Sequence, residues 1–160
     1  MKATTPRGIR NYNPGNLDRV AGVRWQGQAE QQTDSRFVQF VDPRWGIRAI
    51  ARTLITYQDK RRAQDGSRID SVREVISRWA PAHENDTDTY AKQVAKALGI
   101  GPDDECVDVY DFITMSLLVM AIIHHENGPG PLPGQQWYGA QLIAEGLALA
   151  GIVHGVSHGQ

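Results

Sequence analysis

The longest apolar run of the chain ends on an acidic residue. Residues 113–123 carry only two polar side chains, both small hydroxyls, within the stretch FITMSLLVMAIIHHENG. A helix that is apolar nearly all round is normally buried at the centre of a protein. Gly128, which a proline follows, is a typical helix stop. We therefore expect a buried central helix over about residues 111–126, with Glu126 where its apolar stripe reaches the surface.

Four amphipathic patterns flank this run. In each, apolar residues return every three or four positions, which is the spacing of one helix face. Ser71 and Glu74 have the spacing of a capping box, in which each side chain bonds the backbone of the other, so a helix should begin there. Pro81 and Gly99 mark the ends of two patterns. The predicted helices cover about residues 43–64, 71–80 and 140–150, and a further one lies between the cap-like residues 85–88 and Gly99.

The first quarter of the chain has a different pattern. Residues 6–16, PRGIRNYNPGN, are rich in glycine, proline and asparagine and predict a shaped loop. Residues 23–27 and 36–41, VRWQG and RFVQFV, predict short strands of a small hairpin or three-stranded sheet. The chain, residues 1–160, is therefore expected to form a single α+β domain that is mostly helical.

Composition and charge narrow the classes of function. The 160 residues are 41% hydrophobic and 22% charged, which is typical of a soluble globular domain. The net charge of −1 gives no bulk attraction to nucleic acid. Cys106 is the only cysteine, which excludes an intrachain disulfide framework and a thiolate zinc cluster. We expect a monomer that needs no cofactor.

The N-terminus lacks the apolar segment of a signal peptide. The apolar run at residues 113–123 is shorter than the roughly 20 residues that a membrane-spanning helix needs. We therefore expect a protein that is made in a cytoplasm and is not inserted in a membrane.

Glu126 is the strongest candidate for chemistry. A carboxyl group at the mouth of an apolar helix is desolvated, which disfavours its charged form and raises its pKa, as a general acid requires. A solvated acid at a helix end is the plainer alternative. Asn11, Asn13 and Asn16 offer amide groups that suit sugar hydroxyl and N-acetyl groups, and they are equally suited to Asx turns within their own loop.

Several motifs resemble one family of bacteriophage proteins. They are PRGIRNYNPGNL, the WQG of residues 25–27, Asp34 with the two following phenylalanines, WGIRAIARTLITY and WAPAHENDTDTY. The family comprises lysozyme-like endolysins and virion-associated peptidoglycan-degrading proteins. Its opening is usually similar to RGIRNNNPGN, and Tyr12 replaces the middle asparagine here, which leaves the role of that side chain open. The resemblance covers roughly residues 7–128 and implies a lysozyme-like fold.

The order of the motifs suggests a rearranged fold. In lytic transglycosylases, which the chain resembles more faintly, the helix that ends in the catalytic glutamate comes before the asparagine loop and the Trp-x-Gly hairpin. Here that helix comes last. This resemblance implies a circularly permuted lysozyme-like core, with Glu126 in the place of the catalytic glutamate. Glu126 should then lie across a cleft from the hairpin and the asparagine loop.

The resemblance implies cleavage of the β-1,4 bond between MurNAc and GlcNAc in peptidoglycan glycan strands. Glu126 would be the general acid and base, of either a muramidase or a lytic transglycosylase. A hydrolase needs a second carboxylate, for which Glu30 and Asp34 are the candidates, whereas a transglycosylase can use the N-acetyl group of its substrate. The predicted substrate-binding residues are Asn11, Asn13, Asn16, Trp25, Tyr90 and Tyr138.

The same resemblance implies a place of action. A phage protein of this kind is made in the host cytoplasm without a signal peptide. It reaches periplasmic peptidoglycan either after release by a holin or as part of the virion.

Three alternatives stay open. Glu84, in HEND, is a rival acid, although its place before a helix suits a capping role. His124 and His125, or His154 with His158, could suggest a zinc amidase or peptidase. However, adjacent helical residues point about 100° apart and there is no H-E-x-x-H motif, so we expect no metal site. A non-catalytic virion structural or glycan-binding module is the third.

Overall fold

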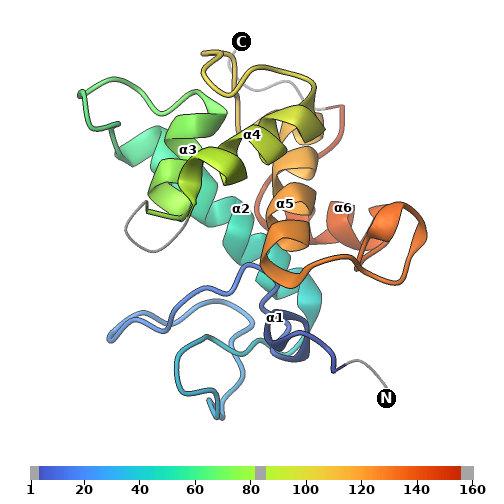
Figure 1. The fold of residues 1–160 in the computed structure, drawn as a ribbon. Coiled ribbons are helices and arrows are strands. Elements are labelled where there is room, and N and C mark those ends of the chain that lie inside the picture. The colour runs from blue at the N-terminus through green and yellow to red at the C-terminus, as the bar shows by residue number, and fades with distance from the viewer. Residues whose placement is uncertain (1–3, 82–85, 156–160) are drawn as a thin grey trace.

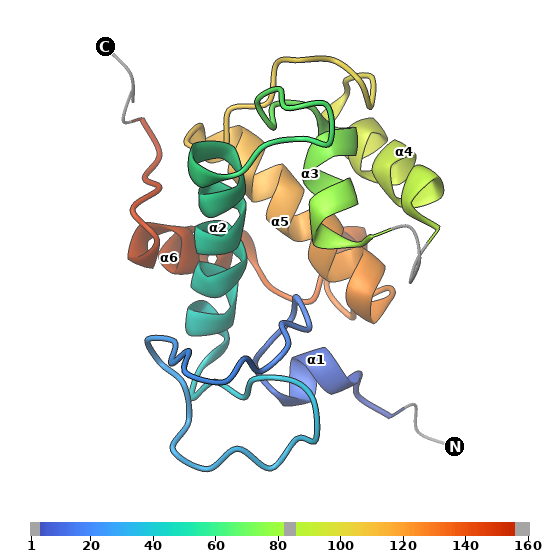
Figure 2. The same cartoon turned by 90° about the vertical axis from the view of Figure 1, so that its left-hand side faces the viewer.

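Helices form the regular structure of the computed structural model, which describes residues 4–81 and 86–155 (Figure 1). In Figure 2, α6 and α4 lie on opposite sides of the molecule, with α2, α5 and α3 between them. The helices are α1 (Arg7–Arg10), α2 (Pro43–Lys60), α3 (Val72–Trp79), α4 (Thr87–Leu98), α5 (Phe112–Asn127), the 3-10 helix η1 (Pro133–Gln135) and α6 (Ala140–Leu149).

The predicted central helix is confirmed as α5. It extends over Phe112–Asn127, one residue later at each end than predicted, and it contacts α1, α2, α4 and α6. Its N-cap is Asp111, whose carboxylate accepts a hydrogen bond from the backbone N–H of Thr114 at 3.0 Å. In the described part of the chain, no helix is both long enough and apolar enough to cross a membrane. The buried residues of α5 are Met115, Leu118, Val119, Ile122 and Ile123.

The flanking helices also agree with the sequence patterns, apart from one boundary. The capping box of Ser71 and Glu74 is present at the start of α3. Helix α2 stops at Lys60, about four residues before the predicted end, because Arg61 is extended and the chain turns back. The residues that follow are polar or small, so they offer the core no apolar face to bury. One main core gathers apolar side chains from α2 to α6.

The predicted β element is wrong. The described residues contain no strand, and the segments predicted to pair meet only through isolated bridges, such as those of Asp18 with Phe37 and of Gln28 with Phe40. Side-chain amides take the place of a ladder. Gln32 donates to the backbone oxygens of Ala29 and Gln39. Over the described residues, the α+β lysozyme-like fold is therefore corrected to an all-helical fold, and the permuted arrangement, which relied on the hairpin, is corrected with it.

A second, smaller hydrophobic cluster anchors this N-terminal loop region to the start of α2. Its buried members are Val38, Phe40 and Ala49, and Trp25 and Trp45 pack against them. The loop passes so close to α2 that residue 27 has to be glycine. Its φ is +77°, and a Cβ there would lie 2.0 Å from the Trp45 ring. The loop region is thus a packed layer even without strands.

Candidate active site

Glu126 lies in the last turn of α5, where the helix meets the asparagine loop. Asn16 donates a hydrogen bond from Nδ2 to Oε1 of Glu126 at 3.3 Å. The hydroxyl of Tyr90, from α4, donates to Oε2 at 3.5 Å. Desolvation raises the pKa of Glu126 above its ordinary value, while the two donors and the positive charge of Arg36 lower it in part. This carboxyl group therefore keeps its proton to higher pH than an exposed glutamate does.

Tyr90 is held from two directions. It has no exposed surface, and its ring stacks on His125 with 3.5 Å between the ring centroids. Burial, more than the neighbouring Glu126, raises the pKa of Tyr90, so its hydroxyl stays a donor at all working pH values. Tyr90 was predicted to bind substrate. Because it has no exposed surface, it is instead placed to contact Glu126 from inside the protein.

The three asparagines of the loop have different surroundings. Asn13 is fully buried, where its Nδ2 donates to the backbone oxygens of Leu17 and Val38 and its Oδ1 accepts from the N–H of Leu17. Asn11 is also buried and donates to Asp34 at 2.9 Å. Both asparagines thus tie their loop to residues that follow it, Asn13 to Leu17 and Val38 and Asn11 to Asp34. Asn16 alone reaches Glu126, from a left-handed backbone with φ of +50°.

Asn127, next to Glu126, ties the end of α5 to the same loop. Its Nδ2 donates to the backbone oxygen of Pro14 at 2.8 Å. Gly8 of α1 sits against both amide groups, since a Cβ on it would lie 2.6 Å from Oδ1 of Asn127 and 2.7 Å from Oδ1 of Asn16. The loop, α1 and α5 thus meet with no room for a methyl group.

The Gly8→Ala variant tests this close contact. Alanine has the higher helix propensity, so any destabilisation reports the clash with Asn16 and Asn127. We expect the free energy of unfolding to fall by about 1–3 kcal/mol, measured by urea denaturation. Gly139→Ala, where a Cβ meets nothing within 4 Å, is the control. Equal effects of the two changes would show that the contact at Gly8 is loose.

A cleft of about 610 Å³ opens in front of Glu126. This volume is within the usual range for ligand-binding clefts. Its charged residues besides Glu126 are Asp18 and Arg36, which pair with each other at 2.6 Å. Tyr57 and Trp79, which line the cleft, were not among the predicted site residues, because their helical spacing is that of core residues. The lining residues are Gly15, Asn16, Leu17, Asp18, Arg36, Phe37, Tyr57, Trp79, Ala80 and Glu126.

The predicted second carboxylates do not line this cleft. Asp34 accepts hydrogen bonds from Nε and Nη2 of Arg7 at 2.7 and 2.6 Å, from Asn11, and from the backbone N–H of Phe37 at 2.8 Å. Arg7, first among these partners, holds the pKa of Asp34 well below its usual range. Glu30 is exposed on the loop. The structure therefore brings neither of them together with Glu126.

The remaining predicted residues lie elsewhere. Trp25 packs in the small cluster of the loop region, and Tyr138 is half-buried against the main core, where burial raises its pKa. Neither lines the cleft of Glu126. Glu84 and His158 fall outside the described residues.

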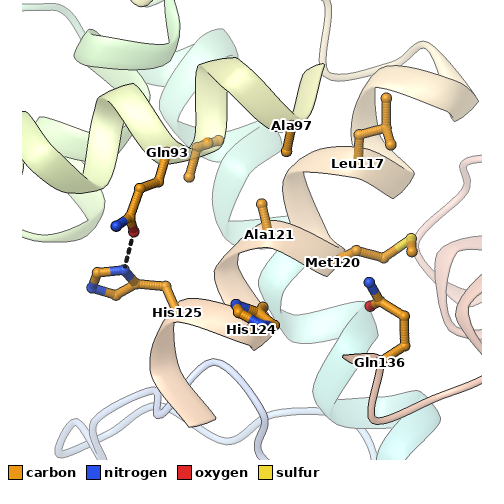
Figure 3. A pocket seen from close by; sticks show the side chains of 9 residues that line it. Gln93, Ala97, Leu117, Met120, Ala121, His124, His125 and Gln136 are labelled. Carbon is orange, nitrogen blue, oxygen red and sulfur yellow. Dashed lines mark hydrogen bonds between the residues drawn. The ribbon is translucent and has the colours of Figure 1, made fainter. Parts of the chain in front are cut away.

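A smaller pocket of about 320 Å³ lies between α4 and α5 (Figure 3). His124 and His125 both line it, and Nδ1 of His125 is 3.4 Å from Oε1 of Gln93. Over the part of the chain that is described, no three histidine, cysteine, aspartate or glutamate side chains are grouped as metal ligands. His125 helps to position Tyr90, because its ring stacks on the ring of Tyr90, whose hydroxyl donates to Glu126.

In its described residues this is a helical protein, with a desolvated acid among the lining residues of a cleft that also carries three aromatic side chains. The chain is 38% identical over 127 residues to Protein P5 of Pseudoalteromonas phage PM2, a match that covers 78% of this chain and 73% of that protein. The chain therefore belongs to the same family as this bacteriophage protein. No family model matches the sequence.

Proposed function

We propose that this protein is a peptidoglycan glycosidase that cleaves the β-1,4 bond between MurNAc and GlcNAc, with Glu126 as general acid and base. The observation that supports it is the Glu126 carboxyl group, which is desolvated, accepts a hydrogen bond from Asn16 and lines a cleft that carries three aromatic side chains. Aromatic faces such as those of Tyr57 and Trp79 suit the apolar faces of sugar rings. The motif resemblance to phage peptidoglycan-degrading proteins points to the same substrate.

The proposed reaction begins with protonation of the leaving group. The Glu126 O–H donates its proton to the glycosidic oxygen while the bond from that oxygen to the anomeric carbon breaks. The N-acetyl oxygen of the substrate stabilises the resulting cation. The Glu126 carboxylate then takes the proton of the C6 hydroxyl, whose oxygen bonds to the anomeric carbon and gives a 1,6-anhydro product. Asn16 and Tyr90 stabilise the carboxylate between the two proton transfers.

The surroundings of Glu126 favour this one-carboxylate route over a muramidase. Among the described lining residues the other acid is Asp18, which pairs with Arg36. Asp34 is engaged by Arg7 and the backbone. A retaining or inverting hydrolase would need a second carboxylate beside the scissile bond.

The test is to incubate the protein with purified peptidoglycan and to analyse the products by mass spectrometry. Ends with 1,6-anhydroMurNAc support the transglycosylase, and reducing MurNAc ends support the muramidase. Peptidoglycan that is bound but left intact would overturn the proposal in favour of a glycan-binding or virion structural module. A phage protein with this activity would act on periplasmic peptidoglycan, after holin release or from the virion.

The pH profile gives a second test, through Tyr90. Its hydroxyl stabilises the ionised form of Glu126, so the Tyr90→Phe variant should raise the pKa of Glu126 further. Because the first step needs protonated Glu126, the alkaline limb of kcat/KM should move to higher pH by up to about one unit. Asn16→Ala should move it in the same direction. A limb that stays in place would show that Glu126 does not set it.

A further inference from the structure

A second groove, of about 800 Å³, adjoins the cleft of Glu126. The last turn of α3 and the residues after it form a wall of both, because Trp79 and Ala80 line the cleft whereas Arg78 and Pro81 line the groove. The guanidinium carbon of Arg78 lies 5.8 Å from the centroid of the Tyr57 ring, which belongs to the cleft. The groove and the cleft thus lie on either side of the end of α3, and Tyr57 of the cleft is beside Arg78 of the groove.

The end of the groove next to the cleft is basic. Arg61 and Arg78 both act on the Tyr57 phenol, whose pKa their charges lower against the larger effect of burial. Arg78 and Arg62 line the groove, and Arg61 directly precedes Arg62 in the chain. Within residues 4–81 and 86–155, none of these three exposed arginines forms an ion pair.

The other charged residues of the groove are engaged within the protein. Arg73 pairs with Asp88 at 2.8 Å and with Asp103 at 2.7 Å. Glu74 accepts from the backbone N–H of Ser71 in its capping box. Asp65, which accepts from Ser67, is the remaining acid. The cationic groups available to a ligand are therefore Arg62 in the groove and Arg61 and Arg78 near Tyr57.

We propose that this groove binds the carboxylate-bearing peptide arm of the same peptidoglycan strand whose sugars lie over Glu126. The assignment rests on the proposed function. MurNAc carries its peptide on the lactyl group, so a peptide arm leaves the glycan at the sugar beside the scissile bond. Guanidinium groups bind carboxylates with paired, charge-assisted hydrogen bonds, and Arg61 and Arg78 offer them within reach of the cleft. The protein would then prefer strands that retain their peptides.

Binding by the Glu126→Gln protein tests this without turnover. The two probes are soluble glycan strands with their peptides and the same strands after an amidase has removed them. We expect the peptide-bearing strands to bind about tenfold more tightly, with a preference that shrinks as salt is raised. The Arg61→Gln, Arg78→Gln double variant should lose about three- to tenfold affinity for the peptide-bearing strands alone.

The controls separate charge from general damage. The Arg10→Gln, Arg24→Gln double variant removes two exposed arginines that line neither the cleft nor the groove. It should leave the affinities for the two kinds of strand unchanged. Arg78→Lys keeps the charge and should keep most of the preference. Equal affinity for the two probes, or an equal loss on both in the double variant, would overturn the assignment. A protein that shows the preference but never cleaves wild-type peptidoglycan would refute the proposed function and leave the groove assigned to the peptide.

Discussion

The Glu126→Gln variant is expected to lose peptidoglycan cleavage while it stays folded and still binds the glycan. Glutamine has nearly the same shape: its Oε1 can accept from Asn16 and its Nε2 can donate to the Tyr90 hydroxyl oxygen, but it has no acidic proton to give to the leaving oxygen. General acid catalysis contributes about 10²- to 10⁴-fold, so the rate should fall by that factor. The measurement is the fall in turbidity of a peptidoglycan suspension, followed by product analysis.

The stability of this variant is informative as well. Because the pKa of Glu126 is raised in the folded protein, its ionisation is disfavoured there, and wild-type stability falls as pH rises through the range above the unfolded pKa. Glutamine removes this cost, so the variant should be as stable as wild type, or more stable, at neutral pH.

Glu105→Gln is the matched control, an exposed acid outside the cleft that should leave both rate and stability unchanged. Lysis that survives the Glu126→Gln change but is abolished by a chelator would instead indicate metal-dependent chemistry.

The Asp34→Ala variant is expected to be strongly destabilised. It leaves the Arg7 guanidinium, the Asn11 amide and two backbone N–H groups without their acceptor, in a site where the Asp34 side chain is 8% exposed. Water can solvate Arg7, whose side chain is 41% exposed, so the cost is that of the unpaired Asn11 amide and backbone N–H groups, about 1–3 kcal/mol. Glu145→Ala, which breaks an exposed ion pair with Arg44, should cost less than about 1 kcal/mol. Urea denaturation of the variants measures both.

The dependence on pH follows from the lowered pKa of Asp34. Its contribution to stability is fully present above the unfolded pKa, near 3.9, and is lost as pH falls from there toward the folded pKa. The wild-type protein should therefore lose stability in acid more steeply than the Asp34→Ala variant. An Asp34→Asn protein of unchanged stability but without activity would contradict this structural role and restore Asp34 as a catalytic carboxylate.

Local signals explain what the sequence predicted well. The limits of α5 follow from a continuous apolar run, an aspartate cap and Gly128. The capping box at Ser71 needs only residues within one turn. The strand prediction was wrong because Gln32, Gln39 and other amide side chains compete with backbone pairing. Alternating apolar residues occur in this packed loop as they do in a strand, so the alternation alone cannot distinguish a strand from a packed loop.

The candidate site was predicted only as far as it is local. Glu126 follows from its own helix, whereas the contact with Asn16 joins residues 110 positions apart. Three similar asparagines gave no sign of which one faces the acid. Tyr57 and Trp79 have helical spacing typical of core residues, and both are indeed half-buried. Their remaining surface lines the cleft, which depends on how α2 and α3 approach the loop.

Glu126 and Asn127, the last two residues of α5, both hydrogen-bond to the asparagine loop. Asn127 donates to the backbone oxygen of Pro14, and Asn16 donates to Glu126. Residues 14–16 of the loop are therefore tied to the end of α5. The exposed stretch 19–24 further along the loop has no such tie to α5 and presents Val20 and Val23 to solvent. Substitutions in that stretch should therefore leave the contact between Glu126 and Asn16 unchanged.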